Sequence, residues 1–141
     1  MEEILRMAVF IDTGIFVAAN NRSDRHHARA IELMKQALES KFGIVYTSDY
    51  VIDEAITTSL ARTHDYRIAL NTGSYVIESP RIQKIFTDSG DFTTGWKNFQ
   101  RLKNKPMSFT DCVSIALMDR RKIDKIMSFD SEFDGLVTRI S

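Results

Sequence analysis

The chain has few of the residues that organise small disulfide-rich or metal-cluster proteins. Its 141 residues include one cysteine, two prolines and six glycines. A lone cysteine, Cys112, excludes an intrachain disulfide and a zinc site built from cysteines. Proline and glycine are scattered rather than gathered into a linker, so we expect a single domain over residues 1–141.

Long apolar runs are also missing. No run approaches the roughly 20 apolar residues that cross a bilayer, and the segment from Met1 to Met7 carries acids where a signal peptide has its apolar core. We therefore expect a cytoplasmic protein with no membrane partner.

The chain has no excess of charge of either sign, because 19 Lys and Arg residues balance 19 Asp and Glu residues. The balance hides a local asymmetry, since residues 97–125 hold eight basic and three acidic side chains. Such a segment is compatible with a basic rim that holds a phosphate backbone beside an acidic pocket. It is more often only a solvated face.

Apolar segments alternate between the spacing of strands and the spacing of helices. Short apolar runs predict strands at residues 7–11, 44–47, 81–87, 126–129 and 137–140. Helical spacing predicts helices from Asp24, the expected N-cap, to about 38, from 48 to about 62, near 65–77, from about 91 to 103, and from 108 onward. Strands separated by helices indicate the α/β class, with a mainly parallel sheet covered on both faces.

Two of the apolar segments end in an aspartate, Asp12 after Val9-Phe10-Ile11 and Asp130 after the run that starts at Ile126. Ligands of open parallel sheets bind outside the carboxyl ends of the strands. Either aspartate alone is equally well explained as a turn or helix-cap residue. Together they favour one shared site.

Two further acids have competing explanations. Ser108-Phe109-Thr110-Asp111 fits a capping box, which by itself accounts for both Ser108 and Asp111. Alternatively, Asp111 stands at a helix N-terminus, where the helix dipole keeps a carboxylate ionised and ready to bind a cation. Glu54 is on an expected helix beside Asp53, and periodicity does not distinguish the two.

A cluster of carboxylates suits the hydrolysis of phosphodiesters. Hard divalent cations prefer oxygen ligands, make bound water nucleophilic and stabilise a charged transition state. Without a cation the carboxylates repel one another, so a cluster of them is costly and is a candidate functional site.

With these residues in hand, the sequence resembles the PIN-domain ribonucleases, particularly the VapC-type toxins of toxin–antitoxin pairs. Five segments carry the resemblance in the family's order. They are Phe10-Ile11-Asp12-Thr13, Asp24-Arg25-His26-His27-Ala28, Thr47-Ser48 with Val51 and Glu54, Ser108-Phe109-Thr110-Asp111 with Ala116 and Leu117, and Ser128-Phe129-Asp130 with Phe133.

The resemblance implies an endoribonuclease that depends on Mg²⁺ or Mn²⁺, with a three-layer α/β/α sandwich around a sheet of about five strands. It selects Glu54 over Asp53 and implies four catalytic acids, with direct metal ligation by two of them. The four are Asp12, Glu54, Asp111 and Asp130, of which Asp12 and Asp111 are the metal ligands.

The resemblance also implies supporting residues. Thr13 and Ser108 are expected to hydrogen-bond to the groups that hold the metal, and Asp134 is a weaker candidate for such a role. Gly14 departs from the family pattern, which often has a small polar residue there.

The partners implied by the resemblance are an RNA substrate, a small antitoxin protein and a second copy of the chain. Two other functions compete with this one. A non-catalytic PIN-like module that binds RNA or protein is the main alternative. A phosphotransfer domain also places aspartates after strands, but Gly14 occupies the position where the phosphatase pattern needs its second aspartate.

Other chemistry-bearing residues have simpler explanations. His26 and His27 are adjacent on an expected helix and point about 100° apart, so we expect His27 to pack or cap rather than to bind metal. Phe92, Trp96 and Phe99 could stack on bases, but we expect them in the core or in a dimer interface.

Overall fold

The computed structural model describes residues 7–141, and its centre is a five-stranded parallel sheet in the order β3-β2-β1-β4-β5. The strands are β1 (Ala8–Ile11), β2 (Ile44–Ser48), β3 (Ile82–Ile85), β4 (Lys125–Met127) and β5 (Thr138–Ile140). Strand β1 lies in the middle, paired with β2 on one side and β4 on the other. The predicted α/β class with a parallel sheet of about five strands is confirmed.

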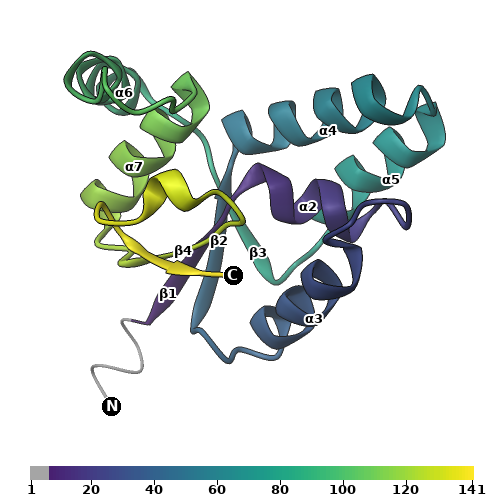
Figure 1. Cartoon of the computed structure of the whole chain (residues 1–141). Helices are drawn as coiled ribbons and strands as arrows, with labels where there is room; N and C mark the ends of the chain where they lie inside the picture. The colour runs from purple at the N-terminus through teal and green to yellow at the C-terminus, as the bar shows by residue number, and fades with distance from the viewer. Residues whose placement is uncertain (1–6) are drawn as a thin grey trace.

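Two helical layers enclose this sheet. Figure 1 shows α2 (Thr13–Ala19), α3 (His27–Leu38), α4 (Asp49–Thr63) and α5 (Tyr66–Ile77) on one side, and α6 (Ser89–Arg101) and α7 (Phe109–Arg121) on the other. A short 3₁₀ helix, η1 (Ser131–Phe133), joins β4 to β5. Within residues 7–141, no helix has both the length and the apolar character to cross a bilayer.

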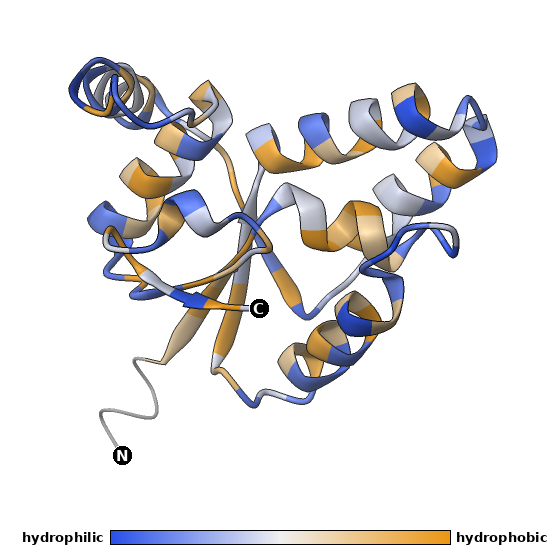
Figure 2. Ribbon diagram, in the orientation of Figure 1, coloured by the Kyte–Doolittle hydropathy of each residue, from blue (hydrophilic) through white to orange (hydrophobic). Residues whose placement is uncertain are grey.

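Burial explains why the central strand, β1, is apolar throughout. All four residues of β1 are buried, and the side chains of Phe10 and Ile11 are completely enclosed. Figure 2 shows the apolar colour along β1 and on the helix faces turned toward the sheet, with hydrophilic residues on the outer faces. A strand covered on both faces needs a continuous apolar run rather than an alternating one, and the central strand has it.

Helix α2 was not predicted from the sequence. Its seven residues, Thr-Gly-Ile-Phe-Val-Ala-Ala, are buried at every position except Gly14. A helix that is apolar on all sides has no polar stripe and therefore gives no amphipathic signal. The sequence does not distinguish such a segment from a continuation of the strand before it.

The prediction that Asp24 is the N-cap of the following helix is wrong. Helix α3 begins at His27 with His26 as its N-cap, and the N-cap side chain makes no capping bond. Instead, Oδ1 of Asp24 accepts a hydrogen bond of 2.8 Å from the backbone N–H of His26. This Asx-type bond, made two residues along the chain, stabilises a turn before the helix rather than its first turn.

Strand β4 is shorter than predicted and ends at Met127. The other helix and strand boundaries differ from the prediction by at most two residues, which is typical of element ends. The shorter strand leaves Ser128, Phe129 and Asp130 in the turn that leads to η1.

We predict opposite effects of alanine at two glycines. Gly43 has φ +85°, and a Cβ there would lie 2.1 Å from the carbonyl oxygen of Met7, so Gly43→Ala should cost at least about 2 kcal/mol of unfolding free energy. A Cβ on helical Gly14 meets nothing within 4 Å, so Gly14→Ala should stabilise by up to about 1 kcal/mol. Urea denaturation measures both, and equal stability of the two variants would contradict the close approach of Gly43 to Met7.

Candidate functional site

A cleft opens at the point in the sheet where the chain order reverses. The chain proceeds outward from β1 through β2 to β3 on one side, and β4 and β5 lie on the other side. Such a reversal separates the connections that follow adjacent strands and leaves a crevice at their carboxyl ends. The cleft has a volume of about 590 Å³. Its walls are formed by Asp12, Thr13, Gly14, Val17, Asp24, Arg25, His26, Glu54, Thr58, Arg62, Pro106, Ser108, Asp111, Phe129 and Asp130.

The structure brings all four acids of the sequence prediction to this cleft, each from a different element. Asp12 directly follows β1 as the N-cap of α2, and Asp130 is the N-cap of η1. Glu54 projects from α4, and Asp111 lies in the first turn of α7. Asp53, the other acid considered for α4, is exposed and does not line the cleft.

Asp12 is the most enclosed of these acids, and only 6% of its surface is exposed. Its Oδ2 accepts a hydrogen bond of 2.6 Å from the hydroxyl of Ser128. Its Oδ1 is buried and has no hydrogen-bond partner within residues 7–141. A buried carboxylate oxygen without a partner is costly, and it is therefore a natural ligand position for a cation.

Ser128 has a part in this site that the sequence reasoning missed. It is completely buried. While its hydroxyl donates to Asp12, its oxygen accepts a hydrogen bond of 3.0 Å from the backbone N–H of Asp130. One side chain thus links the acid after β1 to the acid after β4. The available signal was a small polar residue two positions before Asp130 at the end of an apolar strand.

The environment of the two deepest acids disfavours their charged forms. The pKa of Asp12 is raised from 3.8 to about 7, mainly by burial and next by the charge of Asp111, and the Ser128 hydrogen bond opposes this shift. Burial likewise raises the pKa of Asp111 from 3.8 to about 6, against the effect of its hydrogen bonds with Ser108 and with help from the charges of Asp130 and Glu54. A divalent cation would reverse this penalty by stabilising both carboxylates in the ionised form.

Asp111 combines the two explanations that the sequence left open. The capping box is formed, because Ser108 Oγ accepts a bond of 3.1 Å from the Asp111 N–H and Asp111 Oδ2 accepts one of 3.1 Å from the Ser108 N–H. The same carboxylate also lines the cleft. Within residues 7–141, its Oδ1 has no hydrogen bond to the protein. Capping therefore positions the acid and leaves one oxygen free.

Of the supporting residues predicted from the sequence, Ser108 forms the capping box with Asp111, Thr13 lies in the cleft wall and Asp134 lies outside the cleft. Thr13 is buried in the cleft wall, and its hydroxyl has no partner within residues 7–141. Asp134 is exposed and outside the cleft, where it forms an ion pair of 2.7 Å with Arg139. Arg139 in turn donates to the Ser128 carbonyl oxygen at 3.2 Å. The connection of Asp134 to the site is therefore indirect.

The donors of the cleft fit a hard divalent cation that keeps much of its water. No three His, Cys, Asp or Glu side chains of residues 7–141 converge closely enough to enclose a metal by themselves. Magnesium does not need such an enclosure, because proteins usually hold it through one or two carboxylates together with water and substrate phosphate. The free Asp12 Oδ1 facing a second carboxylate, Asp111, meets that requirement.

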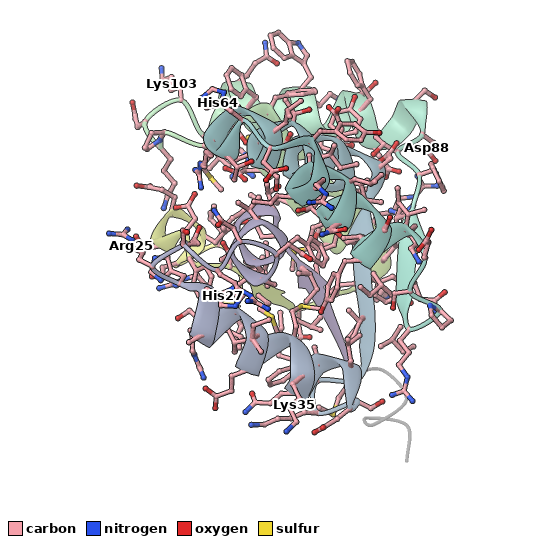
Figure 3. All side chains as sticks on the ribbon, turned by 90° about the vertical axis from the view of Figure 1, so that its right-hand side faces the viewer. Arg25, His27, Lys35, His64, Asp88 and Lys103 are labelled. Carbon is pink, nitrogen blue, oxygen red and sulfur yellow. The ribbon has the colours of Figure 1, made fainter. Side chains whose placement is uncertain are left out.

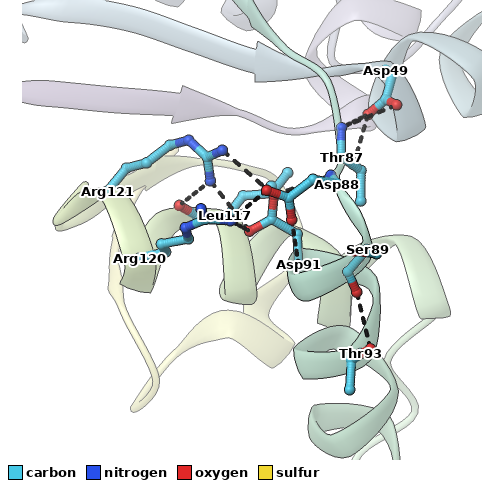
Figure 4. Close-up of polar contacts among 9 residues, drawn as sticks. All are labelled: Asp49, Thr87, Asp88, Ser89, Asp91, Thr93, Leu117, Arg120 and Arg121. Carbon is cyan, nitrogen blue, oxygen red and sulfur yellow. Dashed lines mark hydrogen bonds and ion pairs between the residues drawn. The ribbon is translucent and has the colours of Figure 1, made fainter.

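The basic residues expected at the rim from residues 97–125 are elsewhere. None of the eight lines the cleft. Arg120 and Arg121 stand at the far end of α7 and pair with Asp88 and Asp91, at distances of 2.7 to 3.4 Å (Figure 4). Nine residues of α-helix, about 13 Å, separate Arg120 from Asp111. These charges stabilise the contact between α6 and α7.

Two other arginines, Arg25 and Arg62, lie in the cleft wall. Arg25 precedes α3 and extends outward from the body of the protein (Figure 3). Neither arginine forms an ion pair within residues 7–141. The basic rim is therefore formed by segments that the charge count did not single out.

His27 and the aromatic residues of α6 were not assigned to the site from the sequence, and the structure shows where they lie. His27 lies 2.8 Å from the carbonyl oxygen of Ala18 through its Nδ1, which agrees with a packing role. Phe92, Trp96 and Phe99 are 49%, 51% and 42% exposed, so they do not lie in the core, and the alternative of a dimer interface stays a prediction. Trp96 stacks on Phe99, and the rings of Phe92 and Phe99 lie against Phe109 at the start of α7.

Comparison with known proteins places this architecture among nucleases. The family model described as PIN domain matches residues 9–137. The chain is 28% identical over 131 residues to the VapC ribonuclease of Archaeoglobus fulgidus, a match that covers 90% of this chain and 80% of that one. It is also 28% identical over 128 residues to the 23S rRNA-specific endonuclease VapC20 of Mycobacterium tuberculosis, with 90% and 92% covered.

Solved structures have the same fold. The crystal structure of the Mycobacterium tuberculosis VapC20 toxin superposes with a TM-score of 0.79 at 24% identity, covering 91% of this chain and 94% of that one. A chain of VapBC2 from Rickettsia felis, bound to a DNA fragment from its promoter, superposes with a TM-score of 0.66 at 14% identity, covering 95% and 98%.

We predict that the metal-free protein loses stability as the pH rises. The folded pKa values of Asp12 and Asp111 lie above the unfolded value of 3.8, so the folded state binds more protons between about pH 4 and 7 and the free energy of unfolding falls over that range. Asp12→Asn removes the larger penalty, and at about pH 8 it should stabilise the protein by on the order of 1–4 kcal/mol.

Urea denaturation in EDTA at several pH values measures this effect. The exposed Asp53→Asn is the matched control, and it should show no such gain. The prediction fails if Asp12→Asn is less stable than the unsubstituted protein at alkaline pH.

Proposed function

The chain belongs to the PIN-domain family, and on that premise we propose that it is an endoribonuclease that hydrolyses RNA phosphodiester bonds with the help of Mg²⁺ or Mn²⁺. The observation that carries the proposal is the convergence of four carboxylates on one cleft, where a buried oxygen of Asp12 has no partner among residues 7–141. The relatives named as a ribonuclease and an rRNA endonuclease support the same activity.

Each acid has a distinct task in this proposal. Asp12 and Asp111 would hold the metal, since each has a carboxylate oxygen that makes no hydrogen bond within residues 7–141. Glu54 and Asp130 complete the site, by orienting the attacking water or by holding a second ion. When bound, the metal activates water and stabilises the negative charge that develops on the phosphate.

The supporting residues keep the two metal-binding oxygens in place. The Ser128 hydroxyl donates to Asp12 Oδ2, and the Ser108 amide donates to Asp111 Oδ2. In both acids one oxygen is thereby fixed by the protein, and the other makes no hydrogen bond within residues 7–141. Thr13, whose buried hydroxyl also lacks a partner within those residues, follows Asp12 directly and would support a bound metal through a hydrogen bond.

We further propose that the chain is the toxin of a toxin–antitoxin pair and binds a small antitoxin protein. The structural neighbours include a VapBC2 assembly and a toxin–antitoxin complex from Klebsiella pneumoniae, which support such a partner. Pairing with a second copy of the chain is also part of the proposal. The exposed rings of Phe92, Trp96 and Phe99 on α6 support an interface of some kind on that face.

We predict that the purified protein cleaves RNA only when Mg²⁺ or Mn²⁺ is added. Asp12→Asn and Asp111→Asn should each lower cleavage to the level seen in EDTA, because each removes a charged oxygen from the metal. Glu54→Gln should also lower cleavage strongly, whereas its neighbour Asp53→Asn should not. Gel analysis of a total RNA preparation measures all of these.

Two outcomes would contradict the proposal. Cleavage that persists in EDTA or in Asp12→Asn would remove the metal from the reaction. RNA binding without any metal-dependent cleavage would favour the non-catalytic module instead.

Ser128→Ala tests the residue that links two of the acids. It removes the donor to Asp12 Oδ2, so the carboxylate can rotate and the half-maximal Mn²⁺ concentration for cleavage should rise about 10- to 100-fold. Ser128→Thr keeps the hydroxyl and should restore most of the affinity. An unchanged Mn²⁺ dependence of Ser128→Ala would show that Asp12 does not need this bond.

A further inference from the structure

Two aromatic rings are stacked in the wall of the acidic cleft. The rings of His26 and Phe129 lie 4.5 Å apart between centroids at an angle of 18°. Phe129 stands between Ser128, which holds Asp12, and Asp130. Both rings line the cleft and both are only partly buried. The ring pair, His26 with Phe129, therefore lies directly beside the carboxylates.

The hydrogen bond that His26 makes leaves one face of its ring available for stacking. Arg25 donates a hydrogen bond of 3.1 Å from Nε to His26 Nε2. An arginine only donates, so Nε2 is the acceptor of this bond. A hydrogen bond to a ring nitrogen lies at the edge of the ring, so it blocks neither face. Phe129 covers one of the two faces.

Positive charge stands at the rim of the same cleft. Arg25 and Arg62 are exposed, line the cleft and form no ion pair within residues 7–141. By contrast, Arg120 and Arg121 are occupied by Asp88 and Asp91. The acids at the centre of the cleft repel the phosphates of an RNA strand. Two guanidinium groups at its edge, which form no ion pair within residues 7–141, offset that repulsion.

From these contacts we infer that the ring pair is a stacking platform for an unpaired base next to the phosphate that is cut, with Arg25 and Arg62 binding the neighbouring phosphates. The inference rests on the proposed ribonuclease function and adds to it the residues that bind the base and the phosphates on either side of the cut. A base can stack on the pair only after it has left its own helix, so the substrate must present unpaired nucleotides at the cut. Aromatic stacking tolerates every base, so the platform selects for unpaired structure rather than for sequence.

The test uses two fluorescent probes of equal length and charge, an oligoadenylate and an abasic ribose-phosphate oligomer. Binding is measured by anisotropy with the Asp12→Asn protein in Mg²⁺, which keeps the RNA intact. The oligoadenylate should bind roughly tenfold more tightly or better than the abasic probe. Phe129→Leu and His26→Ala, each added to Asp12→Asn, should bring this ratio close to one by weakening only the oligoadenylate.

The controls separate stacking from a general disturbance of the fold. His26→Tyr keeps an aromatic ring and should retain the ratio, and Phe92→Leu removes an exposed ring on α6 and should not change it. Affinity for the abasic probe shows that each variant is folded. Arg62→Gln should weaken both probes equally and lower the slope of log affinity against log salt by about 0.7.

Equal binding of the two probes by the parent protein, or an undiminished ratio in Phe129→Leu, would overturn the platform. Either result would leave the metal-dependent cleavage of RNA untouched. Loss of that cleavage from the unsubstituted protein would instead refute the proposed function, so the two failures are distinguishable.

Discussion

The arrangement of the site depends on β1 lying between β2 and β4 in a parallel sheet. Because β1 is covered on both faces, it is apolar along its whole length, and the first polar side chain after it, Asp12, emerges at the carboxyl edge. The turn after β4 delivers Ser128 and Asp130 to the same edge. The burial that stabilises the strand is also what desolvates the carboxylate, so the core and the acidic cleft have one physical origin.

The surrounding helices supply the other acids by ordinary means of helix stabilisation. Asp111 satisfies the Ser108 amide in a capping box and still reaches the cleft. Asp88 and Asp91 form a second capping box at the start of α6, and Arg120 and Arg121 join them from α7 (Figure 4). The two clusters stand near opposite ends of α7. The charges of Asp88 and Asp91 are compensated by arginines. In the cleft, by contrast, Asp12 and Asp111 have raised pKa values, and each has an oxygen without a hydrogen bond within residues 7–141. That contrast distinguishes the candidate site from a structural cluster.

Much of the fold could be predicted because local signals agreed with the tertiary structure. Strands with continuous apolar runs and helices with one apolar face stood at the expected places. The failures have specific causes. Helix α2 is buried on all sides and has no periodicity, and Asp24 bonds to the His26 amide within a turn, an arrangement that resembles a cap in sequence.

For the site, periodicity did not separate Glu54 from Asp53, and only the family resemblance did. The roles of Ser128, Arg25 and Arg62 depend on contacts between distant segments, and charge counting along the chain does not detect such contacts.

The hydrogen bond between Ser128 and Asp12 joins residues that are 116 positions apart in the chain. During synthesis Asp12 leaves the ribosome long before Ser128, Asp130 and strand β4 exist. Until β4 inserts beside β1, neither the second wall of the cleft nor the donor that orients Asp12 is present. A nascent chain whose β4 has not yet paired with β1 therefore holds no assembled acidic cleft, because the order of the strands postpones the site until most of the sheet has formed.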